Sequence, residues 1–262
     1  MGRGGIFCHT GRHSRLWKGC FAIKVVILHA MWHIEKHITR REGWMKVEPK
    51  DAVYTGMATT SLLALSLAII GWGVAPLSEQ WLGDYHVLAD FLLFLLVYGV
   101  LSGLLVRLLL RLNPLPNGEF SMDSPHFTRW KLLMMVSDFG RGALLPFTPI
   151  FMRPPVAMLF GATVGKNSAL GGVMADPFMV SVGNGVILGN GSQVCGNFTT
   201  HDKITFGRVT IGDGATVGMN AIVMPGVEIG AGATVLLNSV VMPGTVIPAG
   251  EVWRGNPARK WQ

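Results

Sequence analysis

Aliphatic residues recur at every sixth position through the C-terminal part of the chain. The recurring positions form two series: Val164, Leu170, Asp176, Val182, Leu188 and Val194, and then Ile211, Val217, Val223, Ile229, Val235, Val241 and Ile247. All of them except Asp176 are aliphatic. A helix repeats every 3.6 residues and a strand every two, so neither element explains a six-residue period. A fixed longer period is typical of a repeat architecture.

Each six-residue unit contains what one side of a triangular coil requires. The aliphatic residue of a short strand points inward, and a pair such as Asp213-Gly214 or Ala231-Gly232 turns the corner. Three units close a turn of about 18 residues, and turns stack at roughly 4.8 Å. Small residues at the fifth position let the corners pack closely: Ser168, Ser192, Ala215, Ala221, Ala233, Ser239 and Thr245. We predict a left-handed parallel β-helix over residues 161–262, its open end covered by residues 250–262.

The repeat is interrupted once, between Val194 and Ile211. The interval is 17 residues, so we expect two units plus about five residues to leave the coil as a loop, CGNFTTHDKITFGR. Loops on a rigid scaffold often carry chemistry, and this one contains His201, the only histidine after His126. His201 is therefore the candidate functional residue. The alternative is a solvated loop histidine without a role.

Two long apolar runs precede the repeat. Residues 56–77 carry no charge, and about 20 such residues cross a hydrocarbon layer of roughly 30 Å. A polar connector, Ser78 to Tyr85, leads to the second run at 86–106, which contains Asp90 near its start. We interpret Asp90 as reaching back to the interface rather than as a functional intramembrane carboxylate. Residues 56–112 are thus predicted to form two transmembrane α-helices.

Composition and charge agree with a membrane protein. Half of the residues are hydrophobic and 14% are charged, while the net charge of +7 comes from residues crowded at the N-terminus and beside the apolar runs. That distribution does not form a nucleic-acid recognition module. Lys and Arg precede the first run, Glu79 and Asp84 lie in the connector, and Arg107 and Arg111 follow the second run. Both ends of the hairpin and the β-helix should then face the cytoplasm, with a bacterial inner membrane as the expected location.

Two further segments are less regular. Residues 1–55 form a basic segment, and an alternative start at Met45 is one hypothesis for the native protein. Cys8, Cys20 and Cys195 have neither disulfide nor zinc-ligand spacing, so we expect a reducing compartment and no metal. Residues 113–160 form a bridge in which Pro and Gly rule out one long helix. The bridge lies either at the membrane surface or packed on the domain.

Several motifs resemble those of hexapeptide-repeat acyltransferases. They are the hexads, the D-P step at Asp176-Pro177, T-H-D at residues 200–202, and G-N-P-A-R at residues 255–259, covering the chain from about Met152 onward. Residues 145–253 behind apolar spans also resemble, more loosely, the terminal membrane-attached hexapeptide domain of some peptide synthetases. The acyltransferase resemblance implies a homotrimer and an acyl-coenzyme A co-substrate. It also implies a loop histidine, here His201, as the general base in the cleft between neighbouring subunits.

The chemistry of acyl transfer agrees with that assignment. An imidazole with a pKa near 6.5 can accept the acceptor's proton at neutral pH, and Asp202 or Asp176 would orient the ring. Arg259 and Lys260 are candidates for the coenzyme's phosphates, with the resemblance favouring Arg259. The coenzyme site is also predicted to include further residues of the C-terminal coils: Asn220, Ala221 and Ser239.

Other functions of such coils fit the sequence less well. A zinc carbonic anhydrase of this type needs three histidine ligands, and residues 127–262 contain only one histidine. A sugar nucleotidyltransferase would carry a Gly-rich nucleotide-binding motif ahead of the coil, and no G-x-G-x-x-G follows a strand pattern here. The remaining alternative is a non-catalytic trimeric scaffold at the membrane. Acceptor, acyl chain and the choice of hydroxyl or amine are not readable from the residues, although membrane tethering favours a saccharide, a peptide or a lipid-linked molecule.

Overall fold

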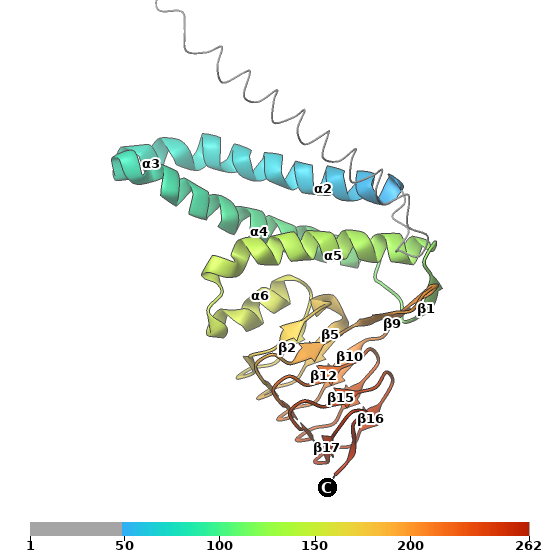
Figure 1. Ribbon diagram of the computed structural model, residues 1–262. Helices are drawn as coiled ribbons and strands as arrows, with labels where there is room; N and C mark the ends of the chain where they lie inside the picture. The colour runs from blue at the N-terminus through green and yellow to red at the C-terminus, as the bar shows by residue number, and fades with distance from the viewer. Residues whose placement is uncertain (1–48, 262) are drawn as a thin grey trace, which may run out of the picture. The chain divides into compact units, whose positions relative to one another are not determined.

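A computed structural model describes residues 49–261, and these belong to one compact unit (Figure 1). Within that unit, helices form the N-terminal part and a parallel β-helix forms the C-terminal part. Most of the predicted basic segment, including Cys8, Cys20 and Met45, lies outside the described residues.

The two apolar runs form a helical hairpin. Its elements are α2 (Pro49–Ala68), the π-helical turn η1 (Ile69–Val74), α3 (Ala75–Leu82), η2 (Gly83–Tyr85) and α4 (His86–Leu112). Helices α2 and α4 contact each other, as Figure 1 shows. The connector expected from Ser78 differs from the prediction, because the chain stays helical as far as Leu82. Ser78 donates a hydrogen bond to Asp90 at 2.6 Å, so the polar groups at this end of the hairpin pair with each other.

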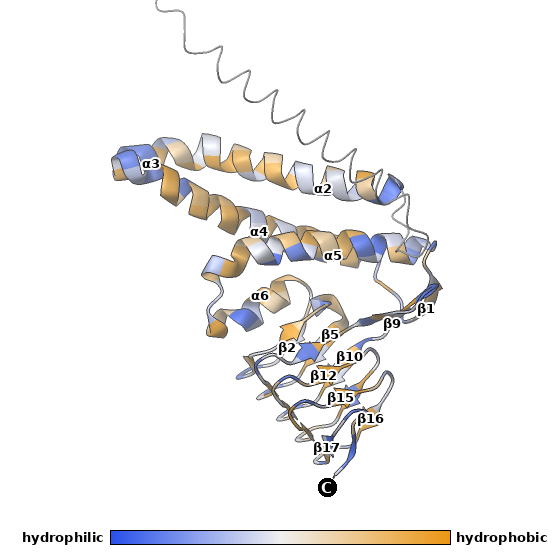
Figure 2. Ribbon diagram, viewed as in Figure 1, coloured by the Kyte–Doolittle hydropathy of each residue, from blue (hydrophilic) through white to orange (hydrophobic). Residues whose placement is uncertain are grey.

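The hairpin has the apolar character that a bilayer requires, as the orange colouring of α2 and α4 in Figure 2 shows. By length and composition, the helical stretch Pro49–Leu112 counts as one candidate span. Its most apolar window of 18 residues has a mean hydropathy of 2.3, and 28% of that window is buried. Core helices of soluble proteins and signal sequences share these properties, so they indicate membrane association only weakly.

The bridge contains several short elements and one long helix. They are β1 (Gly118–Ser121), α5 (Pro125–Leu144), η3 (Leu145–Phe147), η4 (Ile150–Met152) and α6 (Arg153–Leu159). Ser124 caps α5 by accepting a hydrogen bond from the Phe127 N–H, and Pro125 supplies the first-turn residue that lacks an N–H. Pro146 and Pro149 lie in the segment that follows α5, in agreement with the expectation that proline prevents one continuous helix.

Helix α5 packs closely along α4. A Cβ atom at Gly99 of α4 would collide with Leu144, and one at Gly140 of α5 would collide with Ser102. These glycines are required because only a residue without a side chain lets the two backbones approach so closely. Lys131 of α5 also forms an ion pair with the buried Asp51 of α2. Of the two interpretations of the bridge, packing on the body of the protein describes α5.

The repeat folds into three parallel sheets that form the sides of a coil. The strands are β2 (Thr163–Val164), β3 (Ala169–Leu170), β4 (Val173–Met174), β5 (Val180–Val182), β6 (Ile187–Leu188), β7 (Gln193–Val194), β10 (Val209–Ile211), β11 (Thr216–Val217), β12 (Ile222–Val223), β13 (Glu228–Ile229), β14 (Thr234–Val235), β15 (Val240–Val241), β16 (Val246–Ile247) and β17 (Val252–Arg254). The sheets run β16-β13-β10-β5-β2, β17-β14-β11-β6-β3 and β15-β12-β7-β4. In each sheet the predicted inward residues pair with one another, as Ile211 does with Val182 and Ile229.

The corners of the coil have the conformation that the sequence predicts. At most corners the residue three positions after an inward residue has a positive φ, for example Gly214 at 68° and Asn220 at 55°. Glycine adopts this region without strain, and asparagine tolerates it better than most residues. Five of the small residues at the fifth position are fully buried: Ser192, Ala215, Ala221, Ala233 and Ser239. The parallel β-helix of six-residue units is confirmed.

One inward position was assigned wrongly. The strand residue that pairs with Val194 and is buried in the coil is Met174, not Asp176. The side of the coil after Leu170 is two residues short, and the 3-10 turn η5 (Pro177–Met179) adds the two residues back before Val182. Asp176 lies in the corner between β4 and η5. A carboxylate is therefore absent from the apolar interior, where an unpaired charge would be costly.

The interruption also differs from the loop that was expected. It consists of β8 (Asn197–Thr199) and β9 (Lys203–Phe206), an antiparallel hairpin whose second strand pairs with β1. The interval from Val194 to Ile211 is eleven residues longer than one unit, so the coil keeps one unit there instead of losing two. Ile204 and Phe206 are buried, and this alternation explains why the insertion is a strand.

The C-terminal end of the coil is covered by its own hairpin. Strand β18 (Arg259–Lys260) pairs antiparallel with β17. Trp253 packs against the core, and its indole N–H donates to Glu251 at 2.8 Å. Ala258 is buried below the turn. This arrangement matches the expected closing role of residues 250–262.

Candidate functional site

His201 lies in the turn that joins β8 to β9. The turn is closed by a hydrogen bond from the Thr200 N–H to the Lys203 carbonyl at 2.8 Å, and the histidine side chain is exposed. Among the described residues, no hydrogen bond reaches the imidazole ring. The neighbouring Asp202 is also exposed, and its carbonyl accepts from the Met122 N–H at 3.3 Å. The ring is therefore presented outward from the coil, open to a ligand or to another chain.

Asp176 holds the base of this hairpin. Its carboxylate accepts hydrogen bonds from the Trp130 indole N–H at 2.9 Å, the Gly196 N–H at 3.1 Å and the Asn197 amide at 2.6 Å. The residue is 0% exposed, and it joins α5, the corner after β4 and the start of β8. Within residues 49–261 no hydrogen bond joins Asp176 to His201. The structure thus places Asp176 beneath the hairpin instead of beside the ring.

The environment of Asp176 is strongly desolvated. Burial raises the pKa of its carboxyl group and outweighs the three hydrogen bonds and the charge of Arg141, all of which lower it. Arg141 is fixed nearby, because its guanidinium donates to the carbonyls of Met174 at 2.7 Å and Ala175 at 3.3 Å. Burial and the Asp176 charge together raise the pKa of the Cys195 thiol, which favours the neutral form of that cysteine.

Aromatic packing stiffens the hairpin. The ring of Phe206 lies 5.8 Å from that of Phe120 in β1 and 6.3 Å from that of Trp130 in α5, measured between centroids. Lys203 forms an exposed ion pair with Glu119 at 3.6 Å. The hairpin that carries His201 is consequently held by the coil, by β1 and by α5. Sequence reasoning missed Trp130 and Asn197, because their contacts with Asp176 join segments far apart in the chain.

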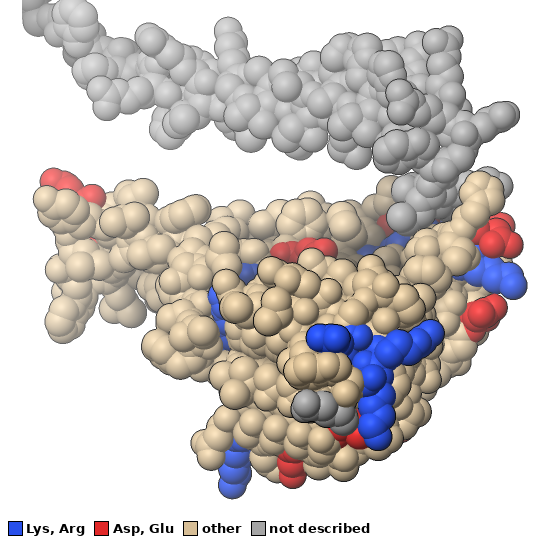
Figure 3. All heavy atoms as spheres, turned by 60° about the horizontal axis from the view of Figure 1, so that its bottom comes forward, with Lys and Arg blue, Asp and Glu red and all other residues tan. Residues whose placement is uncertain are grey.

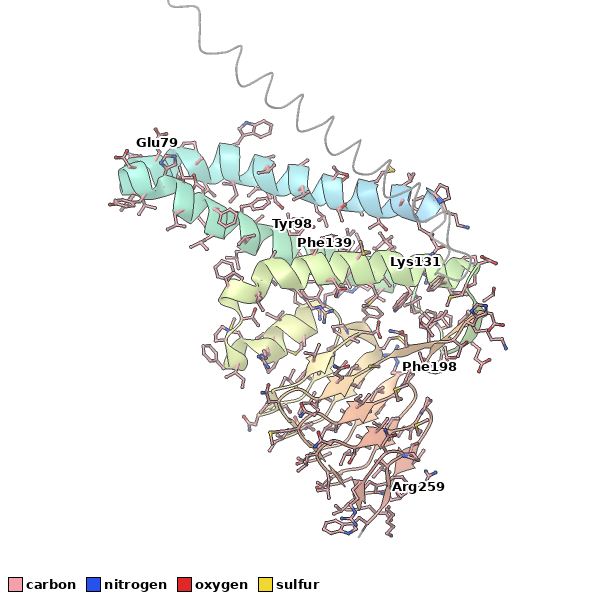
Figure 4. The ribbon with its side chains drawn as sticks, viewed as in Figure 1. Glu79, Tyr98, Lys131, Phe139, Phe198 and Arg259 are labelled. Carbon is pink, nitrogen blue, oxygen red and sulfur yellow. The ribbon has the colours of Figure 1, made fainter. Side chains whose placement is uncertain are left out.

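The basic candidates for coenzyme binding, Arg259 and Lys260, lie at the C-terminal end of the coil. Figure 3 shows Lys and Arg side chains gathered there, and Figure 4 places Arg259 far from Phe198 of the hairpin. Lys260 is paired with Glu251 at 2.6 Å, and Arg254 lies over the Trp261 ring at 4.7 Å. Arg259 is exposed and, among the described residues, has no carboxylate partner. It is the basic group here with most capacity left for an anion.

The other three predicted coenzyme residues are corner residues. Asn220 has a positive φ and donates its N–H to the Asn190 carbonyl at 3.1 Å. Ala221 and Ser239 are fully buried, and the Ser239 hydroxyl accepts from the Gly255 N–H at 3.1 Å. In this chain Ala221 and Ser239 fill the coil and present no surface. Their contact with a coenzyme stays a prediction, and their position favours a structural role.

The described part of the chain contains no candidate metal site. No group of three or more His, Cys, Asp and Glu side chains in residues 49–261 is placed to hold a metal ion.

Comparison with known proteins identifies the repeat. Residues 208–236 match the family model described as bacterial transferase hexapeptide (six repeats). Comparison with curated proteins gives no match. The chain therefore contains the hexapeptide repeat in the region where its coils are most regular.

Solved structures with a similar coil include two acetyltransferases. A hexapeptide-repeat-containing acetyltransferase from Vibrio cholerae is 25% identical, with a TM-score of 0.36, covering 39% of this chain and 62% of that one. Perosamine N-acetyltransferase from Caulobacter crescentus, solved with coenzyme A and GDP-perosamine, is 22% identical, with a TM-score of 0.31, covering 39% and 51%. The match spans less than two thirds of the length of either protein.

Proposed function

We propose that this chain is a membrane-tethered acyltransferase. It moves an acetyl or other short acyl group from coenzyme A to a hydroxyl or amine of a saccharide, peptide or lipid-linked acceptor. One observation carries the proposal: an exposed histidine, His201, at the turn of a braced hairpin that interrupts a transferase-type hexapeptide repeat. A structural repeat has no need of such an insertion, whereas an active site needs a reactive group beside its scaffold.

The proposed reaction requires one base. His201 accepts the proton of the acceptor's hydroxyl or amine while the oxygen or nitrogen attacks the thioester carbonyl carbon. The tetrahedral intermediate then collapses, the carbon–sulfur bond breaks, and coenzyme A leaves as the thiol after receiving the proton that His201 had accepted. Main-chain N–H groups at the corners of the coil are the candidates for stabilising the oxyanion. Asp202, next to the histidine, is the proposed orienting group for the ring.

The elongated shape of coenzyme A suits the separation between the hairpin and Arg259. Its thioester lies at one end of an elongated molecule and its phosphates at the other. The hairpin leaves the β-helix after its second turn, whereas Arg259 lies at the C-terminal end of the coil (Figure 4). We assign the phosphates to Arg259, with Lys260 as the second candidate. The outward direction of His201 supports a homotrimer of left-handed coils in which the histidine completes a cleft with a neighbouring subunit.

Membrane attachment is the second part of the proposal. Helices α2 and α4 would each cross the bilayer, with both ends of the hairpin and the β-helix on the cytoplasmic side of a bacterial inner membrane. Trp72 and Trp81, which are 87% and 84% exposed, flank the end of the hairpin where aromatic residues favour the membrane interface. The basic residues Arg107 and Arg111 follow at the opposite end of α4.

The test compares full-length wild type with His201→Asn, using acetyl-coenzyme A and a panel of lipid-linked sugars and amines. Release of free thiol that depends on an acceptor should fall by about 10²- to 10⁴-fold in the variant, the usual contribution of a general base. His86→Ala is the matched control, because that ring bonds to the Gly83 carbonyl within the helical hairpin. Equal and background-level activity in all three proteins, with a trimer still present, would favour the non-catalytic scaffold instead.

A further inference from the structure

A cavity of about 360 Å³ lies where the helical bridge meets the first coils, apart from the hairpin with His201. Its walls come from the end of α5, from η3 and α6, and from the corners near Gly171 and Gly191. Figure 1 shows α6 and the β8–β9 hairpin on opposite sides of the first coils. The cavity is therefore separate from the proposed catalytic residue of the same chain.

Two guanidinium groups line this cavity. Arg153 donates to the carbonyls of Leu170 at 3.2 Å and Gly171 at 2.8 Å, both through one nitrogen. Arg141 donates through Nη1 to the Met174 carbonyl at 2.7 Å, and Asp138 neutralises its other side at 2.6 Å. These bonds fix both side chains, and among residues 49–261 they leave further N–H groups without a partner.

The charge of the cavity is unbalanced at Arg153, because Asp138 already pairs with Arg141. Its lining contains two arginines and no acidic residue, and within the described part of the chain Arg153 has no carboxylate partner. A rigid guanidinium with spare N–H groups matches the oxygens of a phosphate. The guanidinium groups of the cavity are thus suited to a phosphate or phosphate ester rather than to a cation.

The rim of the cavity is apolar. Leu145 contributes to the lining yet is 73% exposed, and Ile150 and Phe151 of the adjacent η4 are 62% and 74% exposed. Contiguous large hydrophobic residues on a surface indicate contact with a membrane or a partner. The position of this rim beside the apolar run of α4 favours contact with a membrane over contact with a protein partner. A Cβ at Gly99 would meet Leu144, and one at Gly103 would meet Leu159, so both flanking elements lie against the apolar run of α4.

We propose that this cavity binds the phosphate headgroup of a membrane amphiphile. Arg141 and Arg153 hold the phosphate, while the hydrocarbon chain leaves over Leu145, Ile150 and Phe151 into the bilayer. A volume of about 360 Å³ accommodates a phosphate with a small polar group and leaves the long chain outside. The proposal rests on membrane attachment of the helical hairpin and not on the acyl-transfer reaction.

The experiment measures lipid binding by the full-length protein in uncharged detergent. Dioleoyl phosphatidate is titrated and its saturable effect on the melting temperature is followed, with dioleoylglycerol and inorganic phosphate as separate arms. We expect saturation with phosphatidate alone. Arg153→Gln should weaken the affinity about tenfold or more, because a charged hydrogen bond is lost. Arg111→Gln, which alters a basic residue outside the cavity lining, should bind as wild type does.

A second pair of variants leaves the buried bonds intact. Leu145→Asp and Leu145→Asn introduce side chains of the same size at an exposed position, and both remove the apolar contact with the hydrocarbon chain. The aspartate should weaken phosphatidate binding more than the asparagine, because it also repels the phosphate. Equal loss in both proteins, equal loss in Arg111→Gln and Arg153→Gln, or equally tight binding of inorganic phosphate would each overturn the proposal. His201→Asn should bind phosphatidate normally, so failure of the acyl-transfer proposal would remain distinguishable.

Discussion

The coils after Ile211 and the coils before it use the same six-residue unit but carry different additions. From Ile211 to Trp253 every inward residue follows the last by six, and the family model matches here. Before Ile211 the coil contains a shortened side, a 3-10 turn, the hairpin and the contacts with α5 and α6. The regular part is a scaffold, whereas the candidate functional residues other than the coenzyme set lie where the repeat is broken.

The largest effect on stability should come from Asp176→Asn in the irregular part. The amide N–H₂ of the asparagine would face N–H groups that now donate to the carboxylate. Each group left without a hydrogen bond costs about 1–3 kcal/mol. Because Asp176 positions the hairpin, kcat for acyl transfer should fall while KM for acetyl-coenzyme A stays near the wild-type value. Asp138→Asn is the control, since that carboxylate is exposed. A variant with reduced stability but an unchanged kcat would show that Asp176 has no positioning role.

A matching change in the regular part should affect stability alone. Val235→Ala removes two buried methyl groups and leaves a small cavity, at a cost of about 2 kcal/mol. Chemical denaturation in detergent measures this cost. The specific activity of the folded protein, assayed well below its melting temperature, should equal that of wild type. A large loss of kcat would contradict the division into scaffold and functional coils.

A substitution at a corner of the regular part should lower the stability by a smaller amount. Asn238 has φ of 55°, and replacing it with alanine forces a residue with less tolerance for that region into the same corner. The expected loss is about 1 kcal/mol. Asn238→Gly, which relieves the strain, should be at least as stable as Asn238→Ala by the same melting measurement. The opposite order would mean that the asparagine side chain supplies a bond worth more than the backbone strain.

The smallest effect is on the pH dependence of the melting temperature, and it again distinguishes the irregular part from the regular part of the coil. Burial raises the pKa of Asp176 above its ordinary value of 3.8. The protonated form is favoured in the folded state, so this contribution to stability is complete below that value and is lost as the pH rises through the folded pKa. The melting temperature of wild type should contain this decline from about pH 4 upward, and that of Asp176→Asn should lack it. Val235→Ala should keep the wild-type slope.

The six-residue period predicted the β-helix, because each unit specifies its own inward residue. It placed Asp176 wrongly for a physical reason. The distance from Leu170 to Val182 is twelve residues whether it is divided evenly or, as observed, into four and eight. Counting hexads cannot distinguish the two divisions, because η5 restores the phase. The unusual residue type at that position was the only signal of the shift.

The sequence located the insertion between Val194 and Ile211, but it did not predict that the insertion forms a hairpin. The alternation of Ile204 and Phe206 with polar neighbours was a strand signal within a segment interpreted as a loop. Its pairing with β1 was not predictable, since β1 lies about 80 residues earlier and is only four residues long. The same holds for the Trp130–Asp176 bond. Contacts of this kind depend on how α5 is placed against the coil, which no local pattern describes.

The tight crossing of α4 and α5 fixes the helical hairpin against the rest of the protein. Because Gly99 and Gly140 bring the two helices into direct contact, the helical hairpin packs directly against the body of the protein. If the hairpin crosses a bilayer as proposed, the His201 turn is held at one fixed height above the lipid surface. The proposed enzyme would then select acceptors by how far above the membrane they carry their reactive group.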